Sequence, residues 1–214
     1  ADFRLAAQSR PTIWRISALL HSPGVANIRH SMDEASMRER TIASHYARAA
    51  LGGARRAGYD YSGLLQQVGI TPELLSEPRA RIAPEQFTRL LQMLWLALDD
   101  EYLGFAEGPS KRGTFAMMCH ALIHCRTLEK ALERGLLFYS LFPQGPRWRL
   151  TREGEMARLS LDDSQLWDPD HFLSECLLVI WHRLGSWLIG QRIRLDQTTF
   201  SYPMPPHATE YDLL

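Results

Sequence analysis

The chain has few cysteines and no excess charge, and both absences restrict what it can be. Only three of its 214 residues are cysteine, Cys119, Cys125 and Cys176, an odd number without the spacing of a disulfide framework. We therefore expect reduced thiols. Lysine and arginine number 24, as do aspartate and glutamate, so the formal net charge is zero. Because a domain that binds DNA or RNA by itself normally carries a basic excess, the sequence argues against nucleic-acid binding by this chain alone.

Long apolar runs are missing as well. The most apolar stretch, residues 172–189, is interrupted by polar side chains that include Glu175, His182 and Arg183, which excludes a membrane span. The first thirty residues place charged side chains among short apolar patches and show no secretory signal. We therefore expect a cytoplasmic location and no membrane partner.

Signatures of common enzyme classes are also absent. There is no Gly-x-Ser-x-Gly, and the spacing of Gly104 and Gly108 lacks the Lys-Ser/Thr ending of a phosphate-binding loop. The acidic pairs 99–100 and 162–163 fall at the ends of expected elements, where carboxylates commonly cap helices or face solvent. We predict that the chain is not an enzyme and has no catalytic residue and no cofactor.

The segment from Cys119 to Cys125 is the one cluster with metal-ligand chemistry. On a helix, His120 and His124 would lie one turn apart on a single face, where two imidazoles can share an ion. The two cysteines project elsewhere, and no glutamate follows His120, so the pattern of zinc proteases is not met. We predict no metal site, and a small metal-dependent enzyme or metal-binding protein using His120 and His124 remains the alternative.

Glycines, prolines and hydrophobic periodicity divide the chain into elements. Residues 1–40 show no sustained pattern and are predicted to be an N-terminal extension. The following sequence predicts an α+β fold, a helix-rich domain with a small antiparallel β-sheet packed against a long central helix. The expected helices span 41–57, 61–68, 84–98, 114–125, 128–141 and 168–189, with shorter ones opening at Thr71-Pro72 and at 207–213. A hairpin is expected over 147–161, with further strands at 103–106 and 194–202.

Basic and aromatic residues indicate where a ligand could bind. Lys111 and Arg112 stand just before a predicted helix N-terminus, where free backbone N–H groups favour an anion, although a solvated basic turn is the alternative. Trp148 and Trp181 each lie beside a polar residue and are candidates for a small-molecule pocket. Aromatic side chains also fill ordinary cores, so a core position is the competing interpretation.

Several short motifs follow one another in a distinctive order. They are Leu103-Gly104, Gly113-x-Phe115, Arg126-Thr127-Leu128-x-x-Ala131-Leu132 and the proline-rich segment from Tyr202 to Tyr211. Together they resemble the N-terminal effector-binding domain, of the arabinose-binding type, of AraC-family bacterial transcriptional regulators. No single motif is specific; their combined order carries the resemblance, which covers roughly residues 41–214.

The resemblance implies an effector-binding and dimerisation domain over residues 41–214. Such a domain binds a small-molecule effector, forms a homodimer, and controls DNA binding and transcription activation through a C-terminal helix-turn-helix domain that is absent from this chain. Promoter DNA and RNA polymerase would be partners of the full-length protein only. The candidate effector-binding residues are Lys111, Arg112, Phe115, His120, Trp148 and Trp181.

Overall fold

The computed structural model describes residues 41–154 and 156–208. The predicted extension, residues 1–40, lies outside this part of the chain, as does most of the short helix expected at 207–213. The described residues up to Arg192 belong to one compact unit, and residues 193–208 belong to a second.

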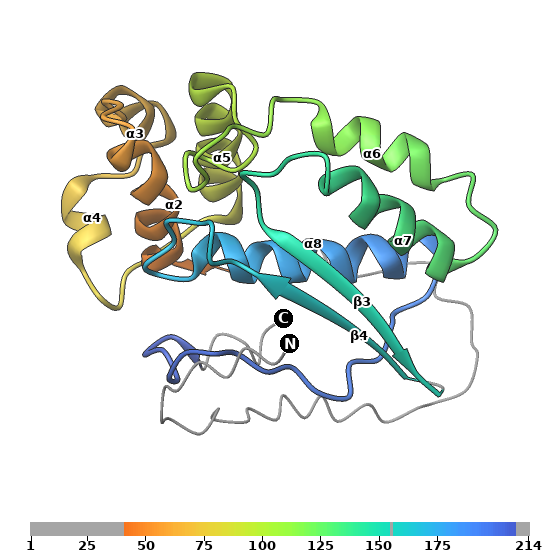
Figure 1. The fold of residues 1–214 in the computed structure, drawn as a ribbon. Helices are drawn as coiled ribbons and strands as arrows, with labels where there is room; N and C mark the ends of the chain where they lie inside the picture. The colour runs from red at the N-terminus through yellow and green to blue at the C-terminus, as the bar shows by residue number, and fades with distance from the viewer. Residues whose placement is uncertain (1–40, 155, 209–214) are drawn as a thin grey trace. The chain divides into compact units, whose positions relative to one another are not determined.

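The first unit is an α+β structure, as predicted (Figure 1). Its strands form two antiparallel pairs, β1 with β2 and β3 with β4. In chain order, the elements are β1 (Ile42–Ala43), α2 (Ser44–Arg56), α3 (Ser62–Val68), α4 (Pro72–Ser76), β2 (Arg81–Ile82), α5 (Pro84–Leu98), α6 (Thr114–Leu122), α7 (Leu128–Tyr139), β3 (Arg147–Glu153), β4 (Met156–Asp162) and α8 (Phe172–Leu188).

Local capping signals account for several helix ends. Thr71 Oγ1 accepts a hydrogen bond from Leu74 N at 3.2 Å, and Thr127 Oγ1 accepts one from Lys130 N at 3.2 Å. Gly69 takes the left-handed conformation after α3, with φ +68°. The three helix boundaries, after residue 68 and at residues 72 and 128, agree with the ranges predicted from the sequence.

The first expected helix begins later than predicted. Residues 42–43 pair with β2 in register Ile42↔Ile82, so α2 starts at Ser44 rather than at Thr41. The glycine pair inside α2 allows a close approach to another segment of the chain. A Cβ on Gly53 would overlap the carbonyl oxygen of Leu103, so glycine is needed there for a close approach of two backbones.

The strand expected at 103–106 does not form. Leu103 and Gly104 both have positive φ, +55° and +82°, which is incompatible with an extended strand. Only Ala106 makes an isolated antiparallel bridge, with Leu166. The helix expected over 114–125 also ends early, at Leu122. The strand expected at 194–202 is absent, because alternating residue types alone do not create a strand.

The hairpin β3–β4 packs against α8, as predicted. Its register pairs Trp148 with Leu161 and Leu150 with Leu159. The ring of Trp148 meets that of the buried Trp181 on α8 edge to face, with centroids 5.6 Å apart. Figure 1 shows α2–α5 toward the N-terminal end of α8, and α6 and α7 toward its C-terminal end. None of the described helices is long and apolar enough to cross a membrane.

Candidate functional site

The anion site expected before α6 is filled by the protein itself. Glu101 Oε1 accepts a hydrogen bond from Gly113 N at 2.8 Å, and its Oε2 accepts one from Phe115 N at 2.9 Å. Lys111 Nζ lies 2.7 Å from Asp99 Oδ2 in an exposed ion pair, which lowers the pKa of Asp99. Arg112 is exposed. The N–H groups that we assigned to a ligand anion are therefore used by Glu101.

The histidines of the Cys119–Cys125 segment do not share one helix. His120 is exposed on α6, whereas His124 follows the end of that helix at Leu122. Across the described residues, no group of three or more His, Cys, Asp or Glu side chains is placed to hold a metal ion. The three cysteines are free, and burial raises the pKa of Cys176 to about 12, which disfavours its reactive thiolate.

The two tryptophans are brought together, but in the core. Trp181 is only 3% exposed and lies between Trp148 and Tyr139, whose ring centroid is 6.2 Å away. Phe115 is half-buried and packs on the same core. None of the six candidate residues lines either of the two depressions described next. The resemblance identified the domain, but the candidate residues that it suggested do not line a depression.

An open depression of about 420 Å³ lies at the C-terminal end of α8. The helix ends in a reversal in which Gly190, with φ +67°, donates from its N–H to Trp187 O at 3.1 Å. Gln191 N donates to Ser186 O, also at 3.1 Å. This hydrogen-bond pair is a Schellman motif, and it turns the chain after α8 back along the last helical turns. The reversal brings Gln191 and Arg192 beside residues of α8.

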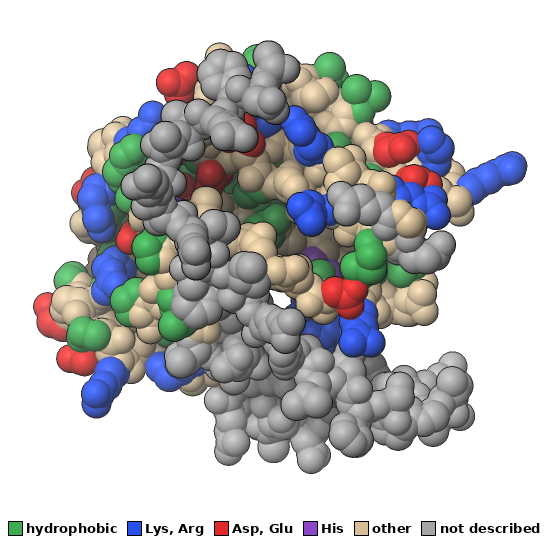
Figure 2. Space-filling view, turned by 60° about the horizontal axis from the view of Figure 1, so that its bottom comes forward, with side chains coloured by type: hydrophobic (Ala, Val, Ile, Leu, Met, Phe, Trp, Pro, Cys, Tyr) green, Lys and Arg blue, Asp and Glu red, His purple; other side chains and the backbone are tan. Residues whose placement is uncertain are grey.

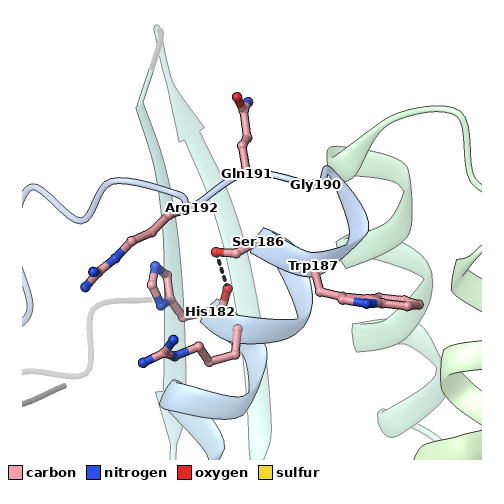
Figure 3. Close-up of a pocket in the computed structure, with 7 residues that line it drawn as sticks. His182, Ser186, Trp187, Gly190, Gln191 and Arg192 are labelled. Carbon is pink, nitrogen blue, oxygen red and sulfur yellow. Dashed lines mark hydrogen bonds between the residues drawn. The ribbon is translucent and has the colours of Figure 1, made fainter. Parts of the chain in front are cut away.

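The α8 depression is lined by basic and polar side chains together with the exposed ring of Trp187, and most of its surface is apolar (Figure 3). His182 and Arg192 lie on the same side of α8, whereas Trp187 extends from the opposite side. Ser186 Oγ donates to the carbonyl oxygen of His182 at 2.8 Å. The described lining residues include no carboxylate; they are His182, Arg183, Ser186, Trp187, Gly190, Gln191 and Arg192. Arg183 and Arg192 line the depression with no acid among the described lining residues, so the site can offer hydrogen-bond donors to an acceptor group, although Arg183 also takes part in another interaction.

Sequence reasoning missed this site, although two signals pointed to it. His182 and Ser186 are four residues apart and therefore share one face of the long helix that was expected there. Gly190 directly after that helix is the usual residue of a reversing cap, and a basic residue follows two positions later. Neither signal matches a catalytic or metal motif.

A second depression, of about 350 Å³, lies under the loop that follows α5. Two of its three charged side chains, Asp100 and Arg56, already have partners, whereas the third, Glu107, is exposed. Asp100 Oδ1 accepts from Tyr102 N and Ser110 N at 2.9 and 2.7 Å, and its Oδ2 accepts from Gly104 N at 2.8 Å. Arg56 donates to the carbonyl oxygens of Gly104 and Ala106. These bonds fix the loop.

A buried acidic cluster precedes α8. Ser174 Oγ lies 2.8 Å from Asp168 Oδ2 and 2.9 Å from Asp163 Oδ2, and Ser174 N donates to Asp168 Oδ2 at 2.8 Å. Burial raises the pKa of Asp168, and the hydrogen bonds from Ser174 oppose that shift. Ser174 is only 4% exposed, so its hydroxyl is not accessible to a substrate as a nucleophile. The cluster anchors the start of α8.

The chain was compared with known proteins. Residues 58–214 match the family model described as the arabinose-binding domain of AraC transcription regulators, N-terminal. The ornithine utilization regulator of Pseudomonas aeruginosa is 23% identical over 168 residues, which cover 78% of this chain and 50% of that protein. The chain thus spans about half the length of this curated relative. No solved structure gives a significant match. Since the family model covers well over half of the sequence, the chain belongs to the family of N-terminal arabinose-binding domains of AraC transcription regulators.

Proposed function

We propose that this chain is the ligand-sensing domain of an AraC-type transcriptional regulator. It binds a small-molecule effector and passes the binding state to a C-terminal helix-turn-helix domain, which contacts promoter DNA and RNA polymerase. The observation that carries this proposal is the family match over residues 58–214. The protein acts in the cytoplasm and performs no catalysis. Residues 41–214 form the effector-binding and dimerisation domain, and residues 1–40 are an extension to it.

The charge distribution supports a sensor that does not hold DNA itself. The chain carries equal numbers of basic and acidic residues. On the face shown in Figure 2, Lys and Arg side chains are dispersed among acidic and apolar ones and do not gather into one basic patch. Phosphate neutralisation by clustered Lys and Arg supplies most non-specific DNA affinity, so DNA contact is left to another domain.

A homodimer is part of the same proposal. Leu137 on α7 and Leu141 just beyond its end are 68% and 72% exposed, four residues apart on the helical period. Exposed leucines at this spacing can pack against a second copy. Light scattering of the purified chain measures the mass, and Leu137→Glu with Leu141→Glu should shift a dimer to monomer while leaving the far-ultraviolet circular dichroism unchanged.

Thermal unfolding with a ligand panel tests the sensing role. The panel contains L-ornithine, L-arginine, L-arabinose, decanoate and benzoate, each at several concentrations. A ligand that binds only the folded chain at about 100 times its Kd stabilises it by about 2.7 kcal/mol. For a chain of this length, that is a rise of roughly 5–10 °C in Tm.

Gel-shift assays test the division of roles. The full-length protein should bind its promoter in an effector-dependent way, whereas the 214-residue chain alone should not. Tight and sequence-specific promoter binding by the chain alone would contradict the proposed assignment of roles.

A further inference from the structure

We propose that the α8 depression receives the negatively charged group of the effector, a carboxylate or a phosphate, with Arg192 as its principal partner. This inference rests on the proposed sensing function and adds the chemical class of the ligand and the residues that recognise it. It concerns residues 182–192 of the first unit only.

The first argument is the combination of cavity and charge. A volume of about 420 Å³ falls within the range of small-molecule sites, roughly 300–1,000 Å³. Arg183 and Arg192 both line the depression, and His182 adds an imidazole. A guanidinium offers five N–H donors in a fixed fork that matches a carboxylate or phosphate with two parallel hydrogen bonds. A cationic or acceptor-poor ligand group would be disfavoured there.

The second argument is how Arg192 is held. The Schellman hydrogen bonds at Gly190 and Gln191 fix the backbone immediately before it. Its side chain is exposed and makes no ion pair with any described residue, so its guanidinium is accessible to a ligand. His182, Arg183 and Ser186 take part in further interactions, which restrain the lining around it. The site therefore combines a fixed frame with one accessible guanidinium.

The end of α8 does not repel an anion as an open helix C-terminus would. The last carbonyls of a helix carry partial negative charge when they lack partners. Here Gly185 O, Ser186 O and Trp187 O accept N–H groups from the reversing turn. The reversing turn therefore weakens the negative partial charge of the helix end, although it supplies no N–H to Leu188 O.

The competing anion site is already closed. At the N-terminus of α6, Glu101 accepts the N–H groups of Gly113 and Phe115. An external anion there would have to displace a carboxylate that is covalently part of the chain. The α8 depression is the better location among the described residues.

Matched ligand pairs and a matched pair of variants test the proposal. The ligands are benzoate with benzamide, decanoate with decanol, and glucose 6-phosphate with glucose, each titrated into the 214-residue chain while Tm and heat of binding are measured. Inorganic phosphate alone separates a phosphate site from a carboxylate site. The variants are Arg192→Gln and, as the control, Arg194→Gln, an exposed arginine two residues on that pairs with Asp196 at 3.7 Å and does not line the depression.

We expect at least one anionic compound to bind the wild-type chain and Arg194→Gln, while its neutral counterpart does not. Arg192→Gln should raise its Kd about tenfold or more, and Arg192→Lys should fall between, because it keeps the charge but loses the paired donors. A neutral compound that binds as well as its anion, or an anion that binds Arg192→Gln unchanged, would overturn the inference and leave the sensing function standing. Failure of every compound, neutral or anionic, here and in the amino-acid and sugar panel would count against the sensing function itself.

Discussion

Two neighbouring loops are each anchored by a buried aspartate, and the two carboxylates are satisfied to different degrees. In the first loop, residues 99–113, Asp100 accepts three backbone N–H groups and uses both of its oxygens. In the second loop, residues 163–171, Asp168 accepts hydrogen bonds only at Oδ2, and its Oδ1 is buried without a hydrogen-bond partner. The loops meet where Trp167 N donates to Phe105 O at 2.7 Å.

The two buried carboxylates differ in the hydrogen-bond donors that each receives. Three N–H groups replace much of the water that Asp100 loses, so these hydrogen bonds stabilise the first loop. Asp168 shares the single hydroxyl hydrogen of Ser174 with Asp163, which cannot serve both carboxylates at once. The second loop therefore holds a carboxylate that resists ionisation, and burial raises its pKa.

The largest loss of stability is expected from Gly53→Ala, because Gly53 on α2 lies against the backbone of the first loop. The added Cβ would overlap Leu103 O and lie 2.8 Å from Gly104 C, both backbone atoms that cannot move aside cheaply. We expect a loss of about 3 kcal/mol or more in the free energy of unfolding, measured in urea.

Gly63→Ala is the matched control for that substitution. It is also a helical glycine, and an added Cβ would have nothing within 4 Å. It should stabilise the chain by about 0.5–1 kcal/mol. Equal effects of the two variants would show that the close backbone approach does not matter.

Asp100→Ala tests the satisfied anchor directly. It leaves the N–H groups of Tyr102, Gly104 and Ser110 without their acceptor, two of them in fully buried bonds. We expect a loss of about 2–3 kcal/mol in urea unfolding, with Asp100→Asn losing less because an amide keeps one accepting oxygen. Asp99→Ala, on the exposed neighbour, should change the stability far less; a comparable loss there would contradict the proposed anchor.

Local signals made most of the fold predictable. Thr71 and Thr127 cap helices through N–H groups three residues ahead, and alternating residues define the hairpin around Trp148. The first loop could not be predicted in this way. Its apolar residues, such as Leu103, predicted a strand. In the structure the Asp100 carboxylate accepts the N–H groups of Tyr102 and Gly104 in a turn, and only the folded chain buries that carboxylate.

The candidate site was harder to predict from the sequence than the fold. The basic pair at 111–112 had the right composition, yet Glu101, ten residues earlier, occupies the helix N-terminus. That competition depends on loop geometry and has no local sequence signal. The α8 depression instead depends on a helix end that was predicted close to its true position, followed by a reversal at Gly190 whose consequence for Arg192 appears only in three dimensions.

Asp168→Asn tests the difference between the two loops through the pH dependence of the free energy of unfolding. The folded-state pKa of Asp168 is raised above its unfolded value, so the folded chain binds this proton more tightly. Its contribution to stability is fully present below the unfolded pKa and is lost as pH rises through the folded pKa. The stability of Asp168→Asn relative to wild type should therefore increase from pH 4 to pH 8, reaching a gain of about 1 kcal/mol.

The choice of a control for that experiment depends on the charged groups around Asp168. Asp163 faces it across Ser174, while His171 in the same loop favours its anion. Asp170→Asn removes an exposed carboxylate from the same loop and serves as the matched control variant. A wild-type-like pH profile for Asp168→Asn would mean that Asp168 is ionised in the folded state as easily as in the unfolded one.

The smallest loss of stability is expected from Thr127→Ala, which removes a hydrogen bond that is exposed to solvent and so tests how much burial matters. Thr127 Oγ1 accepts one N–H, from Lys130 at an exposed helix start, whereas Asp100 accepts N–H groups that water cannot reach. After Thr127→Ala, water can replace the lost acceptor, so the free energy of unfolding should fall by only about 0.5–1 kcal/mol. Thr127→Ser, which keeps the hydroxyl, should restore most of that loss in the same urea titration. If Thr127→Ala instead cost as much as Asp100→Ala, the inaccessibility of the N–H groups could not be what distinguishes the first loop, and the anchors would differ only in the number of bonds that they accept.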